Sequence, residues 1–205
     1  MTAAQRINGW TRRVPAWPIY PVGVAFGAWY FWLAVSGAWI DPVAELEHAI
    51  GLLALKLLVA VLAITPLRNL TRVNLVKYRR ALGVMAFFLV LYHLLVWWFL
   101  DVQSFDRVLA DIAKRPYITV GFSAWLLLLP LAVTSTRGWI RRLGRRWGQL
   151  HKAVYVAACL GVLHFLWLVK SDVREPLLYA GILALLLGLR VWWWRRRGAG
   201  AQRGA

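Results

Sequence analysis

Six apolar runs, each close to twenty residues long, restrict how this sequence can fold. A bilayer core about 30 Å thick needs roughly 20 apolar residues when the chain crosses it as an α-helix. Hydrophobic residues make up 61% of the 205 residues, whereas a soluble domain is about half apolar. The sequence therefore predicts an all-α integral membrane bundle of six transmembrane helices. Within a single domain, 1–205, the expected helices cover residues 19–38, 48–65, 80–100, 117–134, 150–169 and 176–194.

Charge is distributed unevenly between the segments that join these helices. The N-terminus, segments 66–80 and 137–148 and the C-terminal tail are basic and contain no Asp or Glu, whereas all eight acidic residues fall in the other three connections. Because Lys and Arg collect on the cytoplasmic side of membranes, this asymmetry predicts that both termini are cytoplasmic. The net charge of +17 is then explained by the membrane, and no nucleic-acid partner is needed.

The first apolar run has a second interpretation. Arg6, Arg12 and Arg13 precede it, and a basic start followed by an apolar run is also typical of a signal peptide. Its length and its aromatic residues favour a retained helix. The only cysteine, Cys159, excludes an intrachain disulfide and a cysteine-ligated iron–sulfur cluster.

Two histidines are expected at the same depth in different helices. His93 lies 13 residues after Arg80, and His164 lies 13 residues after His151, which is about 20 Å of helix in each case. An ionisable residue inside a membrane is costly, so its first interpretation is functional. Two neutral imidazoles facing each other are what bis-axial ligation of a b-type haem requires. His93 and His164 are thus the candidate ligands of an outer haem iron.

His151 is expected near the inner face, level with Arg79 and Arg80, and is the candidate ligand of an inner haem iron. No second histidine accompanies it in the sequence. Arg79 precedes His93 by 14 residues, which returns to within about 40° of the same helix face. Because arginine stays protonated, we expect Arg79 to bind haem propionates or to be a loop charge. The step from His151 to His164 is about 140° on an ideal helix, so either the haems are offset or the helix is distorted.

Lys56 lies in the middle of the second expected helix. It can extend to the interface, pair with a propionate or bind a quinone oxygen. Together with the histidines it also leaves a different function open, a small transporter or proton channel. His48 is expected at the outer surface, where a solvated role is favoured over ligation.

Five short segments resemble the ferric-reductase-like transmembrane family. They are Thr65-Pro66-Leu67-Arg68, Arg79-Arg80-Ala81-Leu82-Gly83, Tyr92-His93, Leu150-His151-Lys152 and His164-Phe165, in this order within residues 20–194. The resemblance implies that His93, His151 and His164 are haem ligands. Unlike related oxidases, the sequence has Arg79 in place of a fourth histidine and no cytoplasmic FAD/NADPH domain.

The resemblance also implies a role. Within the family, the chain resembles a branch of bacterial inner-membrane subunits. These subunits carry one or two b-type haems per chain and are described as FMN-binding. Electrons would come from the quinone pool or a cytoplasmic flavin reductase. They would pass to MsrP, a periplasmic molybdopterin reductase that repairs methionine sulfoxide in oxidised proteins. The chain itself would be an electron-transfer subunit without a substrate-reducing site.

Overall fold

The computed structural model describes residues 2–202, with side chains described for residues 2–196. This part of the chain contains helices and no strands, so the prediction of an all-α membrane bundle is confirmed. The helices are α1 (Ala3–Arg13), α2 (Ile19–Val35), α3 (Pro42–Thr71), α4 (Arg79–Val96), α5 (Phe105–Lys114), α6 (Pro116–Val133), α7 (Arg137–Leu143), α8 (Arg145–Leu150), α9 (Ala153–Leu168) and α10 (Arg174–Gln202).

Five helical segments in the described residues are long and apolar enough to cross a membrane: Pro42–Thr71, Val76–Val102, Pro116–Val133, Arg145–Leu168 and Arg174–Arg196. The apolar helix α2 is shorter, with 17 residues, which is about 26 Å of helix. That length is at the lower limit for a crossing. The chain is therefore a multi-pass membrane protein.

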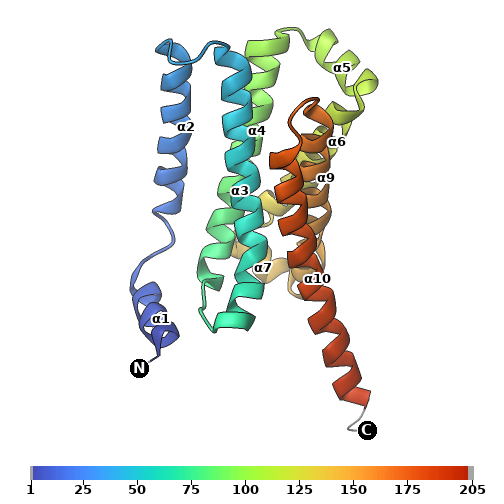
Figure 1. Cartoon of the computed structure of the whole chain (residues 1–205). Coiled ribbons are helices and arrows are strands. Elements are labelled where there is room, and N and C mark those ends of the chain that lie inside the picture. The colour runs from blue at the N-terminus through green and yellow to red at the C-terminus, as the bar shows by residue number, and fades with distance from the viewer. Residues whose placement is uncertain (1, 203–205) are drawn as a thin grey trace.

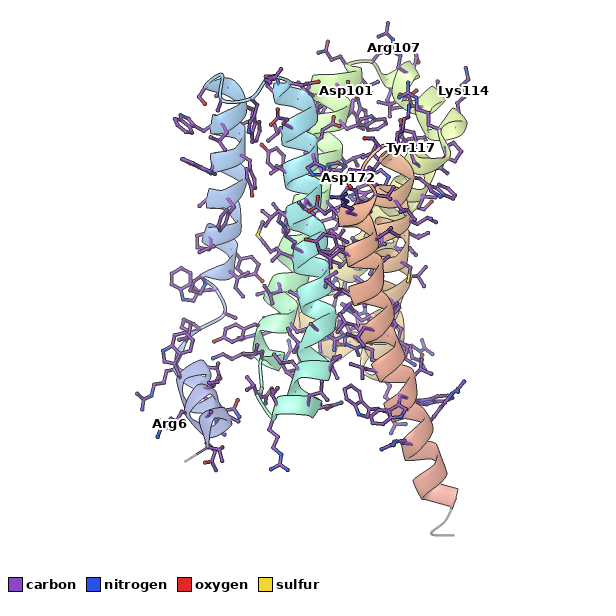
Figure 2. All side chains as sticks on the ribbon, in the orientation of Figure 1. Arg6, Asp101, Arg107, Lys114, Tyr117 and Asp172 are labelled. Atoms are coloured by element: carbon purple, nitrogen blue, oxygen red, sulfur yellow. The ribbon has the colours of Figure 1, made fainter. Side chains whose placement is uncertain are left out.

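The long helices stand side by side, with both ends of the chain at the same end of the bundle (Figure 1). Helix α2 lies at one edge beside α3 and α4, and α6, α9 and α10 form the other side (Figure 1). The closest partners are α3 with α4, and α6 with α9. Helix α5 is at the end opposite the termini, where Asp101, Arg107 and Lys114 also lie, whereas Arg6 is at the terminal end (Figure 2).

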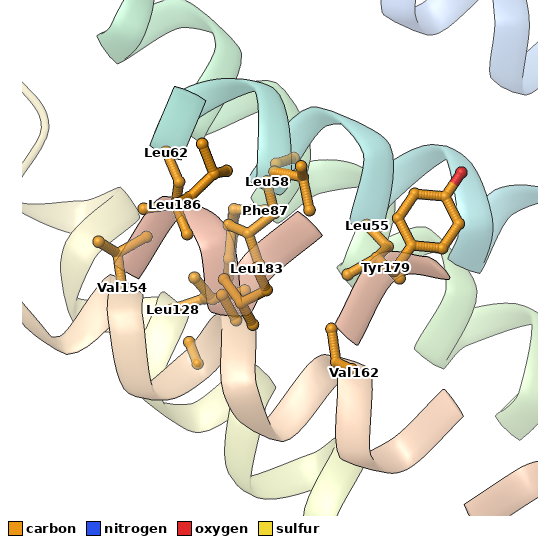
Figure 3. Packing of buried hydrophobic residues seen from close by; sticks show 14 of the residues in the cluster. Leu55, Leu58, Leu62, Phe87, Leu128, Val154, Val162, Tyr179, Leu183 and Leu186 are labelled. Carbon is orange, nitrogen blue, oxygen red and sulfur yellow. The ribbon is translucent and has the colours of Figure 1, made fainter. Parts of the chain in front are cut away.

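Interlocking aliphatic side chains hold α3, α4, α6, α9 and α10 together (Figure 3). Leu62, Ala86 and Ala158 are fully buried there. Lipid tails are as apolar as leucine, so helices associate in a bilayer mainly through close packing. Small residues allow the same close approach at the edge, where Gly27 of α2 faces Tyr92 of α4.

Helix α1 was expected only as a basic N-terminal segment. It is an amphipathic helix with a capping box formed by Thr2 and Gln5. The side chain of Asn8 donates to the carbonyl of Arg72 at 3.0 Å and accepts from the backbone N–H of Asn74 at 2.8 Å. These bonds fasten α1 to the connection between α3 and α4.

The helix at residues 48–65 in the sequence prediction is longer in the structure, because α3 continues through Pro66. A proline has no N–H, so the carbonyl of Leu62, four residues earlier, loses its helical partner. Arg190 of α10 supplies the missing donor, with Nη2 2.7 Å from the Leu62 oxygen. Its Nη1 donates to the Tyr155 hydroxyl at 2.9 Å. Neighbouring helices commonly satisfy carbonyls freed by proline in membranes.

Replacing Arg190 with methionine should therefore destabilise the bundle by about 1–3 kcal/mol, the cost of an unsatisfied buried acceptor. In a Pro66→Ala background, the restored N–H can bond the Leu62 carbonyl, so the same replacement should cost clearly less. Thermal unfolding of the four proteins in detergent measures this coupling. Equal costs in both backgrounds would show that Arg190 does not act through this carbonyl.

Candidate functional site

His93 of α4 and His164 of α9 face each other inside the bundle. Their ring centres are 6.2 Å apart, and the ring planes meet at 78°. A ligating nitrogen lies about 1.2 Å from the imidazole centre, and bonds to a metal at about 2.1 Å. Two axial imidazoles on one metal ion thus have centres about 6.5 Å apart. The observed separation fits two ligands that share one iron.

A backbone carbonyl fixes the orientation of each ring. Nδ1 of His93 lies 2.9 Å from the Glu47 oxygen of α3, and Nδ1 of His164 lies 2.7 Å from the Tyr117 oxygen of α6. A carbonyl oxygen only accepts, so each Nδ1 carries the hydrogen and each Nε2 keeps a free lone pair. Metal-binding histidines commonly have this arrangement, in which the second ring nitrogen donates to a backbone carbonyl.

The two histidines line one cavity, which we call the outer cavity. Its walls are largely apolar, and it also contains buried polar atoms without a partner among the described residues: Oε1 of Glu47 and Nε1 of Trp125. Buried polar atoms normally form hydrogen bonds. The unpaired Trp125 donor is therefore suited to a bound group that carries acceptor oxygens. With the two imidazoles, this donor set fits haem.

The rim of the outer cavity is charged. Arg115 lies between α5 and α6, donates to the Tyr117 hydroxyl at 3.3 Å and lies 3.1 Å from Asp111. The hydrogen bond to Tyr117, with further contributions from Tyr117 and Asp111, raises the pKa of the Arg115 guanidinium. His48 lines the same cavity and is 3.7 Å from a carboxylate oxygen of Glu175. At the outer end, the Arg115 contacts thus join α5 to the start of α6, and the contact between His48 and Glu175 joins α3 to α10.

His151 lines a second cavity, which we call the inner cavity, together with Arg79, Arg80, Lys152 and Tyr155. The structure thus brings Arg79 and His151 to one cavity. His151 lies in the turn between α8 and α9. The helix expected over residues 150–169 is therefore interrupted at its start, which is the distortion that the 13-residue step from His151 to His164 left open.

Two contacts hold the His151 ring in place. Trp147 stacks on it, with ring centres 3.9 Å apart and planes at 28°, and Nε2 lies 3.1 Å from the Thr134 hydroxyl. Trp147 is itself held because its Nε1 donates to the Thr134 carbonyl at 3.0 Å. No second histidine lines this cavity in the described part of the chain. The inner cavity thus offers one imidazole and a basic lining.

Lys56 is not brought to these residues. It is exposed on α3 and lines neither cavity. The sequence correctly predicted that Lys56 lies in the middle of a helix, but it did not predict which face of the helix carries the side chain. It also missed Trp125 and the carbonyls of Glu47 and Tyr117, since no side-chain pattern marks a backbone acceptor.

Residues 47–162 match a family model described as "Ferric reductase like transmembrane component". The match covers more than half of the chain and includes His93 and His151. The chain belongs to the ferric-reductase-like transmembrane family. The family membership predicted from sequence is confirmed.

Relatives within this family are named "Protein-methionine-sulfoxide reductase heme-binding subunit MsrQ". One from Xanthomonas campestris pv. campestris (strain 8004) is 58% identical over 177 residues, covering 82% of this chain and 80% of the relative. Another, from Xanthomonas axonopodis pv. citri (strain 306), is 57% identical over 178 residues, covering 85% and 81%. A third, from Agrobacterium fabrum, is 46% identical over 177 residues, covering 85% and 82%. No solved structure matches the chain.

Proposed function

We propose that this protein is a haem-carrying electron-transfer subunit of a methionine-sulfoxide reductase system in the bacterial inner membrane. The observation that carries the proposal is the pair His93 and His164, with ring centres 6.2 Å apart and each Nδ1 bonded to a carbonyl. The relatives named as heme-binding MsrQ subunits support the same function. The acceptor is the periplasmic molybdopterin reductase MsrP, which repairs oxidised periplasmic proteins.

When bound, a b-type haem supplies an iron centre that accepts and releases one electron. His93 and His164 would hold this iron through their Nε2 atoms, since each Nδ1 is bonded to a backbone carbonyl. The Trp125 N–H is available to a carboxylate oxygen of the group, and the leucines of the outer cavity exclude water. The carbonyls of Glu47 and Tyr117 orient the two imidazoles before the group binds.

The inner cavity is the proposed site of a second haem. His151 would supply its imidazole ligand, and Arg79 would bind its propionates. FMN is the second candidate for this cavity, since a phosphate would bind the same basic side chains. Electrons would enter here from the quinone pool or from a cytoplasmic flavin reductase, a direction supported by the basic connections at this end of the bundle.

The outer end is the proposed docking surface for MsrP. Asp101 and Asp172 lie at this end with Arg107 and Lys114 (Figure 2). Helix α5 adds the exposed side chain of Phe105. A mixed-charge surface with apolar residues suits a transient complex for electron transfer.

The transporter alternative receives no support from the position of Lys56, which lies outside both cavities. A proton path from Lys56 to the histidines would have to cross the apolar packing of α3. We therefore retain electron transfer as the proposed function.

An absorption spectrum of the purified protein tests the proposal. Reduction with dithionite should produce the sharp α-band of a six-coordinate b-type haem. Haem per polypeptide, measured as the pyridine haemochrome, should give one or two. A folded preparation that is colourless as purified and binds no added haem would contradict the function.

A further inference from the structure

We propose that Gly51 and Gly121 are positioning residues for the two facing histidines, an inference that rests on the proposed haem ligation. The absence of a side chain at these two positions exposes the carbonyls to which the imidazoles donate. The same arrangement occurs twice, once between α3 and α4 and once between α6 and α9.

The spacing explains how the glycines act. Glu47 precedes Gly51 by four residues, and Tyr117 precedes Gly121 by four residues. In an α-helix, each carbonyl bonds the N–H four residues later. The Cβ of that later residue tilts back toward the helix N-terminus, over the same carbonyl. Glycine removes this Cβ, so a ring from the neighbouring helix can reach the second lone pair of the oxygen.

The distances are tight at both positions. A Cβ added to Gly121 would lie 2.7 Å from Nδ1 and 2.9 Å from Cε1 of His164. A Cβ added to Gly51 would lie 3.1 Å from Nδ1 and 3.2 Å from Cε1 of His93. Ordinary van der Waals contacts are longer, at about 3.5–4.0 Å. Alanine at 121 therefore has to displace its ring, whereas alanine at 51 demands a smaller shift.

Displacing an imidazole ring changes both its protonation pattern and its orientation as a metal ligand. The bond from Nδ1 to the carbonyl fixes the tautomer and raises the basicity of Nε2. A ring that leaves the carbonyl loses both effects, and its Nε2 turns away from the facing histidine. The glycines thus act on the iron through the histidines, without touching it.

Gly121→Ala and Gly51→Ala test this inference. We expect about 10–100-fold weaker haem binding for Gly121→Ala, as is typical when a partner of a metal ligand is lost, and a smaller loss for Gly51→Ala. Haem titration and the low-spin ferric EPR signal measure the effect. In the apoprotein, ¹⁵N shifts of the histidines report the tautomer, which should change at His164 in Gly121→Ala.

Gly181→Ala and Gly188→Ala are matched controls. Both glycines lie in α10, and a Cβ at either position meets nothing within 4 Å. We expect wild-type haem affinity in both. Wild-type affinity, EPR signal and tautomer in Gly121→Ala would overturn the inference, as would a larger loss in Gly51→Ala. Should the wild-type protein bind no haem, the proposed function fails instead; the tautomer measurement would still test the role of the glycines.

Discussion

Replacing either His93 or His164 by alanine should abolish the outer haem. Each side chain would supply one of the two imidazoles that hold the iron, and the other histidine lining this cavity among the described residues, His48, packs on Phe165 and lies 3.7 Å from Glu175. With one of them removed, a single imidazole would remain to hold the group in a largely apolar cavity. We expect near-complete loss of the low-spin EPR signal of this haem, and a matching loss of haem per polypeptide.

His48→Ala is the matched control for these two variants. His48 also lines the outer cavity, but its ring packs on Phe165, with centres 5.7 Å apart, and it is within ion-pair distance of Glu175. It should keep the outer haem, with at most a small loss of stability. Unchanged haem content in both His93→Ala and His164→Ala would exclude this pair as the ligands.

The sequence predicts the depth of residues in a membrane better than the direction in which they point. Counting residues from the basic ends placed His93 and His164 at one level, and their rings meet in the structure. Lys56 shows the limit of the method, because the sequence left open whether it extends to the interface or reaches a cofactor, and only the structure shows that its side chain is exposed. Direction depends on how helices pack against one another, which residue counting does not give.

Backbone contacts between distant helices were also beyond residue counting. The bond from Arg190 to the Leu62 carbonyl joins residues 128 positions apart, and although Pro66 marks the freed acceptor, nothing in the sequence marks its donor. The contacts of Gly51 with His93 and of Gly121 with His164 have the same limit, because each joins two different helices.

His151→Ala should remove the inner haem and leave the outer one. His151 is the imidazole that lines the inner cavity among the described residues; Trp147 stacks on its ring, and ligation through Nε2 would replace its contact with the Thr134 hydroxyl. With a haem in each cavity, we expect haem per polypeptide to fall by about half, while the EPR signal of the outer haem persists. In proteoliposomes, electron transfer from an inner donor to an outer acceptor should drop sharply, because the inner half of the membrane loses its carrier.

A variant at Arg79 tests the same cavity through the redox potential of the proposed inner haem. A positive charge near an iron favours its reduced form, which carries one positive charge fewer. Arg79→Gln should therefore lower the midpoint potential of the inner haem, on the order of tens of millivolts for a partly buried charge. Arg80→Gln is the matched control: Arg80 lines the same cavity but is exposed, so solvent screens its charge. Equal redox titrations for wild type and Arg79→Gln would mean that Arg79 is an ordinary loop charge, and wild-type haem content in His151→Ala would mean that His151 holds no haem in the inner cavity.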